Sequence, residues 1–461
     1  MKGITKLLLL TSVSLTLAGC PFDDDDGPAP VPVVPAPAPA PDPNPAFLRI
    51  THASPDAPAV NILANDAVLG GLENVDYQVS SGWLEVEAAD YAVAVDAILA
   101  DMTTTAVIEA TLTLESDKTY DVIAVNETAS IEPLVIVNDF TAVTAGNVRV
   151  QVVHAAPAAP EVDIYVTAPD SDITMEQPLA TAAFKDYTAQ VEVPAGDYQI
   201  RITPAGSTTV VFDSGSISLA DGADLLVAAT ENVTTGQSPV TLHVADGMSS
   251  FQIRDVNAGS HLRVVHAVAD APAVDVIANN ALTLVDAAPF LAGTDYLMVA
   301  DADYLIDIAA DADNSLVVID DAAVTLEQGV SYTAIANSDL ANIQLGLLTD
   351  NTRRLATAAQ VRIIHASPSA GEVDIYVTAD GNIADVDPTF TAVPFATPLA
   401  ETGFVQLPAG DYYVTVTVTG SKDAALETGM LSLAADAIYT AIAVDANGGG
   451  LLPQLILLDD F

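Results

Sequence analysis

Four histidines, each at the same point of a repeated phrase, are the residues of this chain best suited to chemistry. An imidazole can act as a general base, as a metal ligand or as a hydrogen-bonding core residue. The surrounding residues must decide among these roles. The phrases are RITHASPDAPAVNI at 49–62, RVQVVHAAPAAPEVDI at 149–164, RVVHAVADAPAVDV at 263–276 and RIIHASPSAGEVDI at 362–375, and the histidines are His52, His154, His266 and His365.

A catalytic role would require a nucleophile beside each histidine. Ser54 and Ser367 lie two residues after the histidine in the first and fourth phrases, whereas the second phrase has Ala156 at that place and the third has Val268, followed by Ala269. A serine that is absent from half of the copies is not part of a repeated histidine–nucleophile pair. The sequence therefore predicts no catalytic residue, no cofactor-binding residue and no enzyme.

Metal binding is the second chemical role to consider. One histidine per repeat cannot supply the four ligands of a tetrahedral zinc site. Carboxylates suit calcium, and Asp301, Asp303, Asp311 and Asp313 lie close together in the sequence. No loop in the chain has the central glycine and closing glutamate of an EF-hand. We therefore assign no metal ligand and keep calcium as an open alternative.

The alternation of side chains places each histidine on the inner face of a strand. Leu262, Val264 and His266 fall on one face of an extended segment, whereas Arg263 and Val265 fall on the other. An imidazole at the last inward position can pack its ring in the core and hydrogen-bond the following turn. We predict that all four histidines are structural and hold the turn after the strand.

Patterns of period two extend through the whole repeated region. In PAGDYYVTVTVTG, the alternate residues from Tyr412 to Val418 are apolar or aromatic, and threonines stand between most of them. Many short strands separated by Gly, Pro and Asp turns are typical of antiparallel sandwiches. We expect an all-β chain of four tandem immunoglobulin-like antiparallel β-sandwich domains, without an amphipathic helix.

One spacing within the repeats resembles a known device of immunoglobulin-like sandwiches, the tyrosine corner. Leu326 is followed by a glycine and then by Tyr332, and Tyr120 and Tyr439 stand in nearly the same context. The second repeat has Leu225 at this place. The corner hydrogen bond is therefore expected in three repeats and excluded in the second.

The repeat pattern indicates a pair of repeats that was later duplicated. Repeats 1 and 3 share DAPAV, repeats 2 and 4 share EVDIYVTA and PAGDY, and the corresponding histidines are 214 and 211 residues apart.

Short connectors between the repeats, such as 350–359, predict four sandwiches that have few contacts with one another. The expected divisions are a signal peptide at 1–19, a lipidated cysteine with an acidic and Pro-rich linker at 20–46, and repeats at 47–143, 144–250, 251–352 and 353–461.

The four phrases and their PAGDY-type turns together resemble the bacterial domain-of-unknown-function family numbered 4397. That family occurs in exported proteins and lipoproteins, often in tandem. The resemblance covers nearly all of 47–461 and implies no activity, because none is established for the family.

The beginning of the chain, MKGITKLLLLTSVSLTLAGC, resembles a bacterial lipoprotein signal with its lipobox. Two lysines precede an apolar run that is too short to span a membrane, and Cys20 is the only cysteine. The resemblance implies a diacylglyceryl thioether on Cys20, cleavage before it and acylation of the new amine. A proline-rich segment follows and favours an extended spacer.

The net charge of the chain limits the classes of molecule that it can bind. The formal net charge is −49, with 13 basic and 62 acidic residues, so nucleic acid is excluded as a partner, because binding phosphates needs a basic face. Arg149, Arg263 and Arg362 recur with Asp163, Asp275 and Asp374, whereas repeat 1 has Arg49 and Asn61. We expect both the arginines and the aspartates to point outward, without direct pairing across a hairpin.

The sequence as a whole predicts a lipid-anchored protein of the bacterial cell envelope, on the outer membrane and facing the periplasm or the outside. Its expected role is structural, adhesive or surface-presenting. The alternative is a binding module for a cation, a glycan or a protein outside the cytoplasm.

Overall fold

The computed structural model describes residues 44–395, 399–451 and 453–459. The predicted signal peptide, Cys20 and almost all of the linker lie outside the described residues. The described chain is all-β, as expected, and its helical turns are η1 (Thr128–Ser130), η2 (Ile173–Met175), η3 (Leu340–Asn342) and η4 (Pro368–Ala370). No helix among the described residues is long and apolar enough to cross a membrane.

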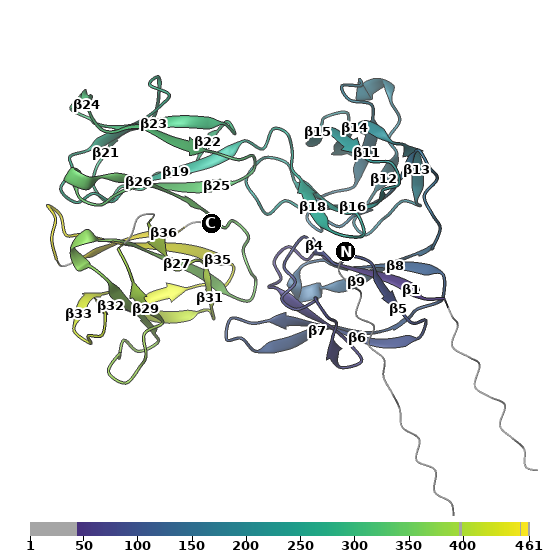
Figure 1. The fold of residues 1–461 in the computed structure, drawn as a ribbon, viewed down its shortest axis with the longest axis horizontal. Coiled ribbons are helices and arrows are strands. Elements are labelled where there is room, and N and C mark those ends of the chain that lie inside the picture. Colours follow the sequence, from purple (N-terminus) through teal and green to yellow (C-terminus); the bar gives the residue numbers. More distant parts are fainter. Residues whose placement is uncertain (1–43, 396–398, 452, 460–461) are drawn as a thin grey trace, which may run out of the picture. The chain divides into compact units, whose positions relative to one another are not determined.

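Eight sheets stack in pairs, and each pair is named here as a sandwich (Figure 1). Sandwich 1 has the sheets β4-β1-β8-β9, with β5 also on β1, and β3-β2-β6-β7. Its strands are β1 (Ala46–His52), β2 (Val60–Ala64), β3 (Ala67–Val68), β4 (Val79–Ser80), β5 (Leu84–Val86), β6 (Asp90–Ile98), β7 (Thr104–Thr113), β8 (Lys118–Val125) and β9 (Glu132–Asp139).

Sandwich 2 repeats this plan with the same number of strands, but one strand instead of two flanks its first strand, and an extra strand lies at the opposite edge of that sheet. Its sheets are β13-β10-β16-β17-β18 and β12-β11-β14-β15. Its strands are β10 (Asn147–His154), β11 (Val162–Thr167), β12 (Ala180–Ala182), β13 (Val191–Pro194), β14 (Gly196–Pro204), β15 (Phe212–Leu219), β16 (Asp224–Glu231), β17 (Val240–Ala245) and β18 (Ser250–Ile253).

Sandwiches 3 and 4 follow the same order. Sandwich 3 has β22-β19-β25-β26 and β21-β20-β23-β24, and sandwich 4 has β30-β27-β35-β36, with β31 on β27, and β29-β28-β32-β33, with β34 on β32. The strands are β19 (Ser260–His266), β20 (Val274–Ala278), β21 (Leu282–Ala288), β22 (Leu297–Val299), β23 (Asp303–Ala310), β24 (Asp313–Thr325), β25 (Ser331–Asn337), β26 (Gln344–Thr349), β27 (Ala359–Ala366), β28 (Val373–Thr378), β29 (Phe390–Val393), β30 (Ala400–Glu401), β31 (Val405–Leu407), β32 (Gly410–Val418), β33 (Ala424–Glu427), β34 (Leu431–Leu433), β35 (Ala437–Val444) and β36 (Gln454–Asp459).

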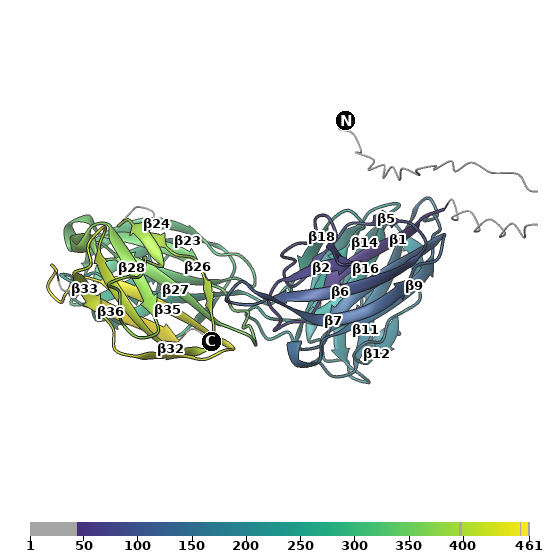
Figure 2. The ribbon, with the colours of Figure 1, turned by 90° about the horizontal axis from the view of Figure 1, so that it is seen from below.

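The core of each sandwich lies between its two sheets, where the period-two pattern directs the apolar side chains. In sandwich 3, Leu262 and Val264 of β19 pack against Val274 and Val276 of β20 and against Ile308 of β23. The predicted inward face of the first strand is confirmed. Figure 2, seen from below, shows the long neighbouring strands of the layers, such as β6 and β7 of sandwich 1.

The outer faces of the first sheets are also buried, because the sandwiches pack in pairs. Sandwiches 1 and 2 share an apolar cluster that includes Ile123, Val153 and Leu226, and sandwiches 3 and 4 share one that includes Val265 and Ile364. The expectation that the four sandwiches touch little is therefore wrong. The outward aliphatic side chains on the first strands would be exposed to water without a second sheet to cover them.

The connector between sandwiches 3 and 4 is bonded as well. The guanidinium of Arg353 donates to the carbonyl of Ala57 at 2.6 Å and pairs with Asp76, both in sandwich 1. The hydroxyl of Thr352 donates to the carbonyl of Val233 in sandwich 2 at 2.6 Å. This connector is therefore an ordered contact segment.

The tyrosine corner is present in the three predicted sandwiches. The hydroxyls of Tyr120, Tyr332 and Tyr439 each accept the backbone N–H five residues earlier, at 2.8, 3.2 and 3.2 Å. In sandwich 2, Leu225 stands at this place and lines an apolar cavity of about 260 Å³. The core of sandwich 2 is therefore less completely filled where Leu225 replaces the tyrosine.

Leu225→Tyr is expected to stabilise sandwich 2 by about 1 kcal/mol, because the ring fills part of the cavity and its hydroxyl gains a backbone donor. Calorimetry of the full chain would measure this as a higher melting temperature. Tyr120→Phe is the converse control and should cost about 1 kcal/mol, since it removes the acceptor of the Glu115 N–H. A lower melting temperature for Leu225→Tyr would contradict the prediction.

Candidate functional site

The four repeated histidines are buried, and three of them hold the following turn as predicted. Nε2 of His52, His154 and His365 lies 3.1, 3.0 and 2.6 Å from the carbonyl oxygen six residues later, at Pro58, Pro160 and Gly371. Nδ1 of each accepts the backbone N–H two residues later, at 3.3 to 3.4 Å. A carbonyl only accepts, so Nε2 carries the proton, and both ring nitrogens are engaged.

His266 differs from this pattern. Its Nδ1 lies 3.0 Å from the carbonyl oxygen of Ala288, at the end of β21, and not from the turn after β19. Its Nε2 is buried without a hydrogen-bond partner. The prediction that His266 ties down its own turn is therefore wrong, although the prediction that it lies in the interior is confirmed.

An aromatic ring stands edge-on to every one of these histidines. The ring centroids are 6.0 to 6.4 Å apart, with interplanar angles of 69 to 83°. The sequence reasoning missed these partners, although each lies 24 to 30 residues after its histidine. The partners are Tyr77, Phe184, Phe290 and Phe395.

Burial favours the neutral form of three of these imidazoles, those of His52, His266 and His365. Burial lowers the pKa of His52 to about 4, and the hydrogen bond to Pro58 only partly opposes that effect. Burial also lowers the pKa of His266 and of His365. A ring that is enclosed and bonded through both nitrogens, as in His52, is suited to hold a turn and not to exchange protons with a substrate.

The two candidate serine nucleophiles do not present their hydroxyls to the histidines. In sandwich 4 it is the backbone N–H of Ser367 that reaches Nδ1 of His365, while its hydroxyl donates to Asp445. In sandwich 1 the hydroxyl of Ser54 is buried without a partner. These contacts do not form a nucleophile–base pair of the kind that acyl transfer requires.

The repeated arginines point away from the core of their own sandwich, as expected. They are nevertheless buried, because the two sandwiches of each pair pack against each other there. Arg49 donates to Asp121 at 2.6 Å and to the carbonyl of Ala245 in sandwich 2 at 2.9 Å. Its guanidinium also lies over the ring of Trp83. Asp121 is the register partner of Arg49 across the parallel strands β1 and β8. Burial raises the pKa of Asp121, and Arg49 opposes this.

In the second pair, the carboxylate at the interface comes from the connector. The register partner of Arg362 is Thr440, which cannot carry a charge. Asp350 follows β26 and pairs with Arg362, and the side chains of both are fully buried. Asp350 also accepts the hydroxyls of Tyr296 at 2.8 Å and Thr333 at 2.7 Å. One carboxylate thus joins sandwiches 3 and 4.

The recurring aspartates accept backbone N–H groups where the strands of the second sheets are irregular. Asp374 accepts the N–H of Ala392 at 2.8 Å and of Gly420 at 2.9 Å. Asp275 accepts the N–H of Ala287 at 2.8 Å. Ala287 and Ala392 both have positive φ, a conformation that alanine rarely adopts. The buried carboxylates therefore stabilise strained backbone there.

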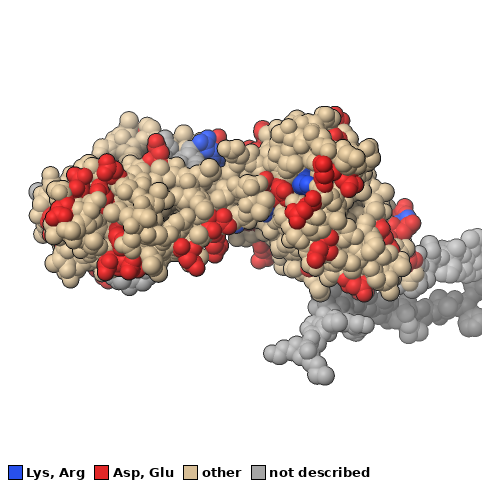
Figure 3. All heavy atoms as spheres, turned by 90° about the horizontal axis from the view of Figure 1, so that it is seen from above, with Lys and Arg blue, Asp and Glu red and all other residues tan. Residues whose placement is uncertain are grey.

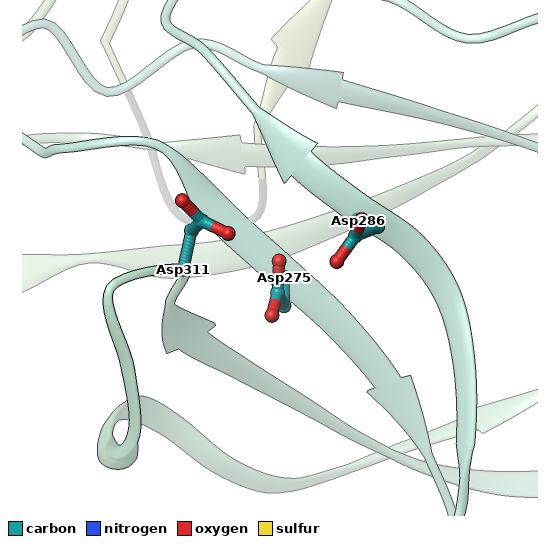
Figure 4. A group of neighbouring side chains, drawn as sticks. All are labelled: Asp275, Asp286 and Asp311. Atoms are coloured by element: carbon teal, nitrogen blue, oxygen red, sulfur yellow. The ribbon is translucent and has the colours of Figure 1, made fainter.

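Two groups of three carboxylates are the candidate metal sites among the described residues. One joins Asp275, which is buried, with Asp286 and Asp311, which are exposed. Figure 4 shows Asp286 and Asp311 on either side of Asp275. The ligand oxygens of such a group lie within 4.8 Å of one another. The second group, in the same sheet, is Asp307, Asp320 and Asp321.

The grouping expected from sequence proximity does not form. Asp303 accepts the hydroxyl of Thr325, and Asp313 accepts the hydroxyl of Ser315, each at 2.6 Å. Of that sequence cluster, Asp311 alone enters a three-carboxylate group. Strand pairing brings it beside β20 and β21, which no local pattern could indicate.

The exterior carries the charge of the chain. Figure 3 shows acidic side chains scattered over the visible face and few basic ones. Of the basic residues in the described part of the chain, Arg49, Arg149, Arg201, Arg263 and Arg362 are buried. The surface is acidic because acidic residues outnumber basic residues in the chain, 62 to 13.

Comparisons with solved structures are weak. At 10% identity and a TM-score of 0.16, the chain is similar over 40% of its length to 93% of a structure described as "Alpha-glucan binding by a streptococcal virulence factor". It is also similar to the Bacillus anthracis TIE protein, with 11% identity, 85% and 69% of the two chains covered, and a TM-score of 0.15. A multi-modular glycogen-degrading pneumococcal virulence factor gives 10% identity, 81% and 37% coverage, and a TM-score of 0.17. No curated protein matches the chain.

The family comparison is informative. The family described as a domain of unknown function, DUF4397, matches residues 46–165 and 260–376. The two matches begin 214 residues apart, which is the spacing of the duplicated sandwich pairs, and together they cover more than half of the chain. The chain therefore belongs to the DUF4397 family of domains of unknown function, in tandem copies.

Proposed function

We propose that this chain is a non-catalytic, lipid-anchored protein of the bacterial cell envelope that presents a firm acidic surface. One observation carries the proposal: the repeated side chains that could do chemistry are used to build the fold. His52 and His365 bond their turns, and Arg362 and Asp350 join two sandwiches. Sandwiches packed in this way suit structural, adhesive or presenting roles, because they keep surface loops in fixed relation.

The anchor is tested by Cys20→Ser. The full chain should be in the membrane fraction of cells and should carry an acyl label, whereas the variant should be released and unlabelled, since a lipid chain needs the thiol. Ser54→Ala is a matched control that should remain membrane-bound. A Cys20→Ser protein that still sediments with membranes would refute the anchor.

A cation-binding module is the second candidate, favoured by the carboxylates around Asp275. Calcium prefers carboxylate oxygens, and this group offers three. Titration calorimetry with calcium chloride should then give a binding signal, and excess calcium should raise the melting temperature. Asp286→Asn should remove the effect, and Asp380→Asn, at an exposed site in sandwich 4, should not. Absence of heat at millimolar calcium would exclude this candidate.

A further inference from the structure

The methionines of this chain have an unusual distribution. Five of the six, all but Met1, lie in the described residues, and their side chains are 58 to 87% exposed. None of the buried hydrophobic residues in the described part is a methionine. Methionine is ordinarily among the more buried residues and fills gaps in cores. The five are Met102, Met175, Met248, Met298 and Met430.

Their positions are turns and edges, where a polar side chain costs nothing. Met102 lies in the turn between β6 and β7 with a φ of 64°. Met175 ends the turn η2, and Met248 lies in the turn between β17 and β18. Met298 is in the short edge strand β22, and Met430 precedes β34. Each sandwich carries at least one of them.

The other oxidisable groups that the fold needs are enclosed. The repeated histidines and Tyr120, Tyr332 and Tyr376 are buried. Trp83 is only partly exposed and is covered by the guanidinium of Arg49. A neutral oxidant of the peroxide class therefore meets thioethers first.

We propose that these five methionines are surface sulfoxidation sites that take up peroxide without harm to the fold. The thioether sulfur attacks one oxygen of hydrogen peroxide, the O–O bond breaks, that oxygen stays on the sulfur, and the other oxygen leaves as water with both protons. The sulfur loses two electrons and becomes a sulfoxide, which is polar and reversible by sulfoxide reductases. A sulfoxide in a core would disrupt packing, but at these positions it points into water.

The experiment treats the full-length protein with hydrogen peroxide and follows each methionine by peptide-mapping mass spectrometry, with a urea-unfolded sample beside it. All five should gain one oxygen at rates within about threefold of the unfolded sample, because susceptibility follows exposure. The melting temperature of the fully oxidised protein should stay within about 1 °C of the untreated protein. A protected site, or a larger fall in melting temperature, would overturn the proposal.

Two variants sharpen the test. Leu226→Met keeps the volume of a fully buried residue in the cluster between sandwiches 1 and 2, and the new sulfur should react more than about tenfold slower than the five. The double variant Met102→Leu with Met248→Leu does not depend on core repacking. It should take up two oxygens fewer and melt as wild type does. An unchanged oxygen uptake would count against the proposal.

Discussion

Asp350→Ala should destabilise sandwiches 3 and 4 by about 3–5 kcal/mol, because the buried guanidinium of Arg362 loses its fully buried counter-ion and keeps only the partly exposed Glu401, at 3.5 Å. Both side chains of the Asp350–Arg362 pair are fully buried. The same change deprives the hydroxyls of Tyr296 and Thr333 of this acceptor. Calorimetry of the full chain should show the transition of this pair at a markedly lower temperature, while sandwiches 1 and 2 melt as before.

Two further variants test whether the loss of stability comes from breaking the buried ion pair. Asp139→Ala removes the partner of Lys118 at an exposed site and should leave melting unchanged, since exposed ion pairs contribute little. The double variant Arg362→Met with Asp350→Leu should recover much of the loss, because apolar residues can replace a buried ion pair. If Asp350→Ala melted like Asp139→Ala, the joint between the sandwiches would not depend on this carboxylate.

The second large effect is a loss of stability between pH 6.5 and about 4. The folded-state pKa is lowered to about 4 in both His52 and His243, mainly by burial. Over this window the unfolded chain binds more protons than the folded chain, so the free energy of unfolding falls as the pH falls. A depression from 6.5 to about 4 corresponds to roughly 3 kcal/mol for each histidine, fully lost only near pH 4.

Neighbouring charges shape this effect. Arg353 lowers the pKa of His52 further, Asp56 and Asp76 raise it, and Arg49 lowers the pKa of His243. The carboxyl groups of Asp121, which is buried, and of Asp224 and Glu231, which are partly buried, have raised pKa values and act in the opposite direction. Subtracting a variant from wild type removes these shared contributions.

Unfolding by urea at several pH values would measure the effect. His52→Gln should be less stable than wild type at pH 7, yet its stability should depend less on pH below 6.5. His261→Gln alters a histidine that is only partly buried and should change the profile much less. An identical pH dependence in His52→Gln and wild type would show that protonation of His52 is not linked to unfolding.

Much of the fold follows from local patterns in the sequence. The alternation around His266 gave the inner face of β19, because successive side chains of a strand point to opposite sides whatever lies beyond them. The leucine at 225 excluded a corner hydrogen bond, because no hydroxyl is present. The repeat spacing and the family phrases indicated tandem sandwiches, and the family match confirms the resemblance.

Only the tertiary structure determined which distant side chains contact one another. Alternation places Val265 on the outer face of β19 but cannot say that a second sandwich covers it, since that depends on the joint burial of two distant surfaces. Asp350 meets Arg362, and Asp311 meets Asp275, only after sheets have paired in register. His266 contacts the carbonyl oxygen of Ala288, 22 residues away, and not its own turn, which the alternation of side chains could not indicate. Local sequence determines which way a side chain points, and only the assembled sheets determine what it meets.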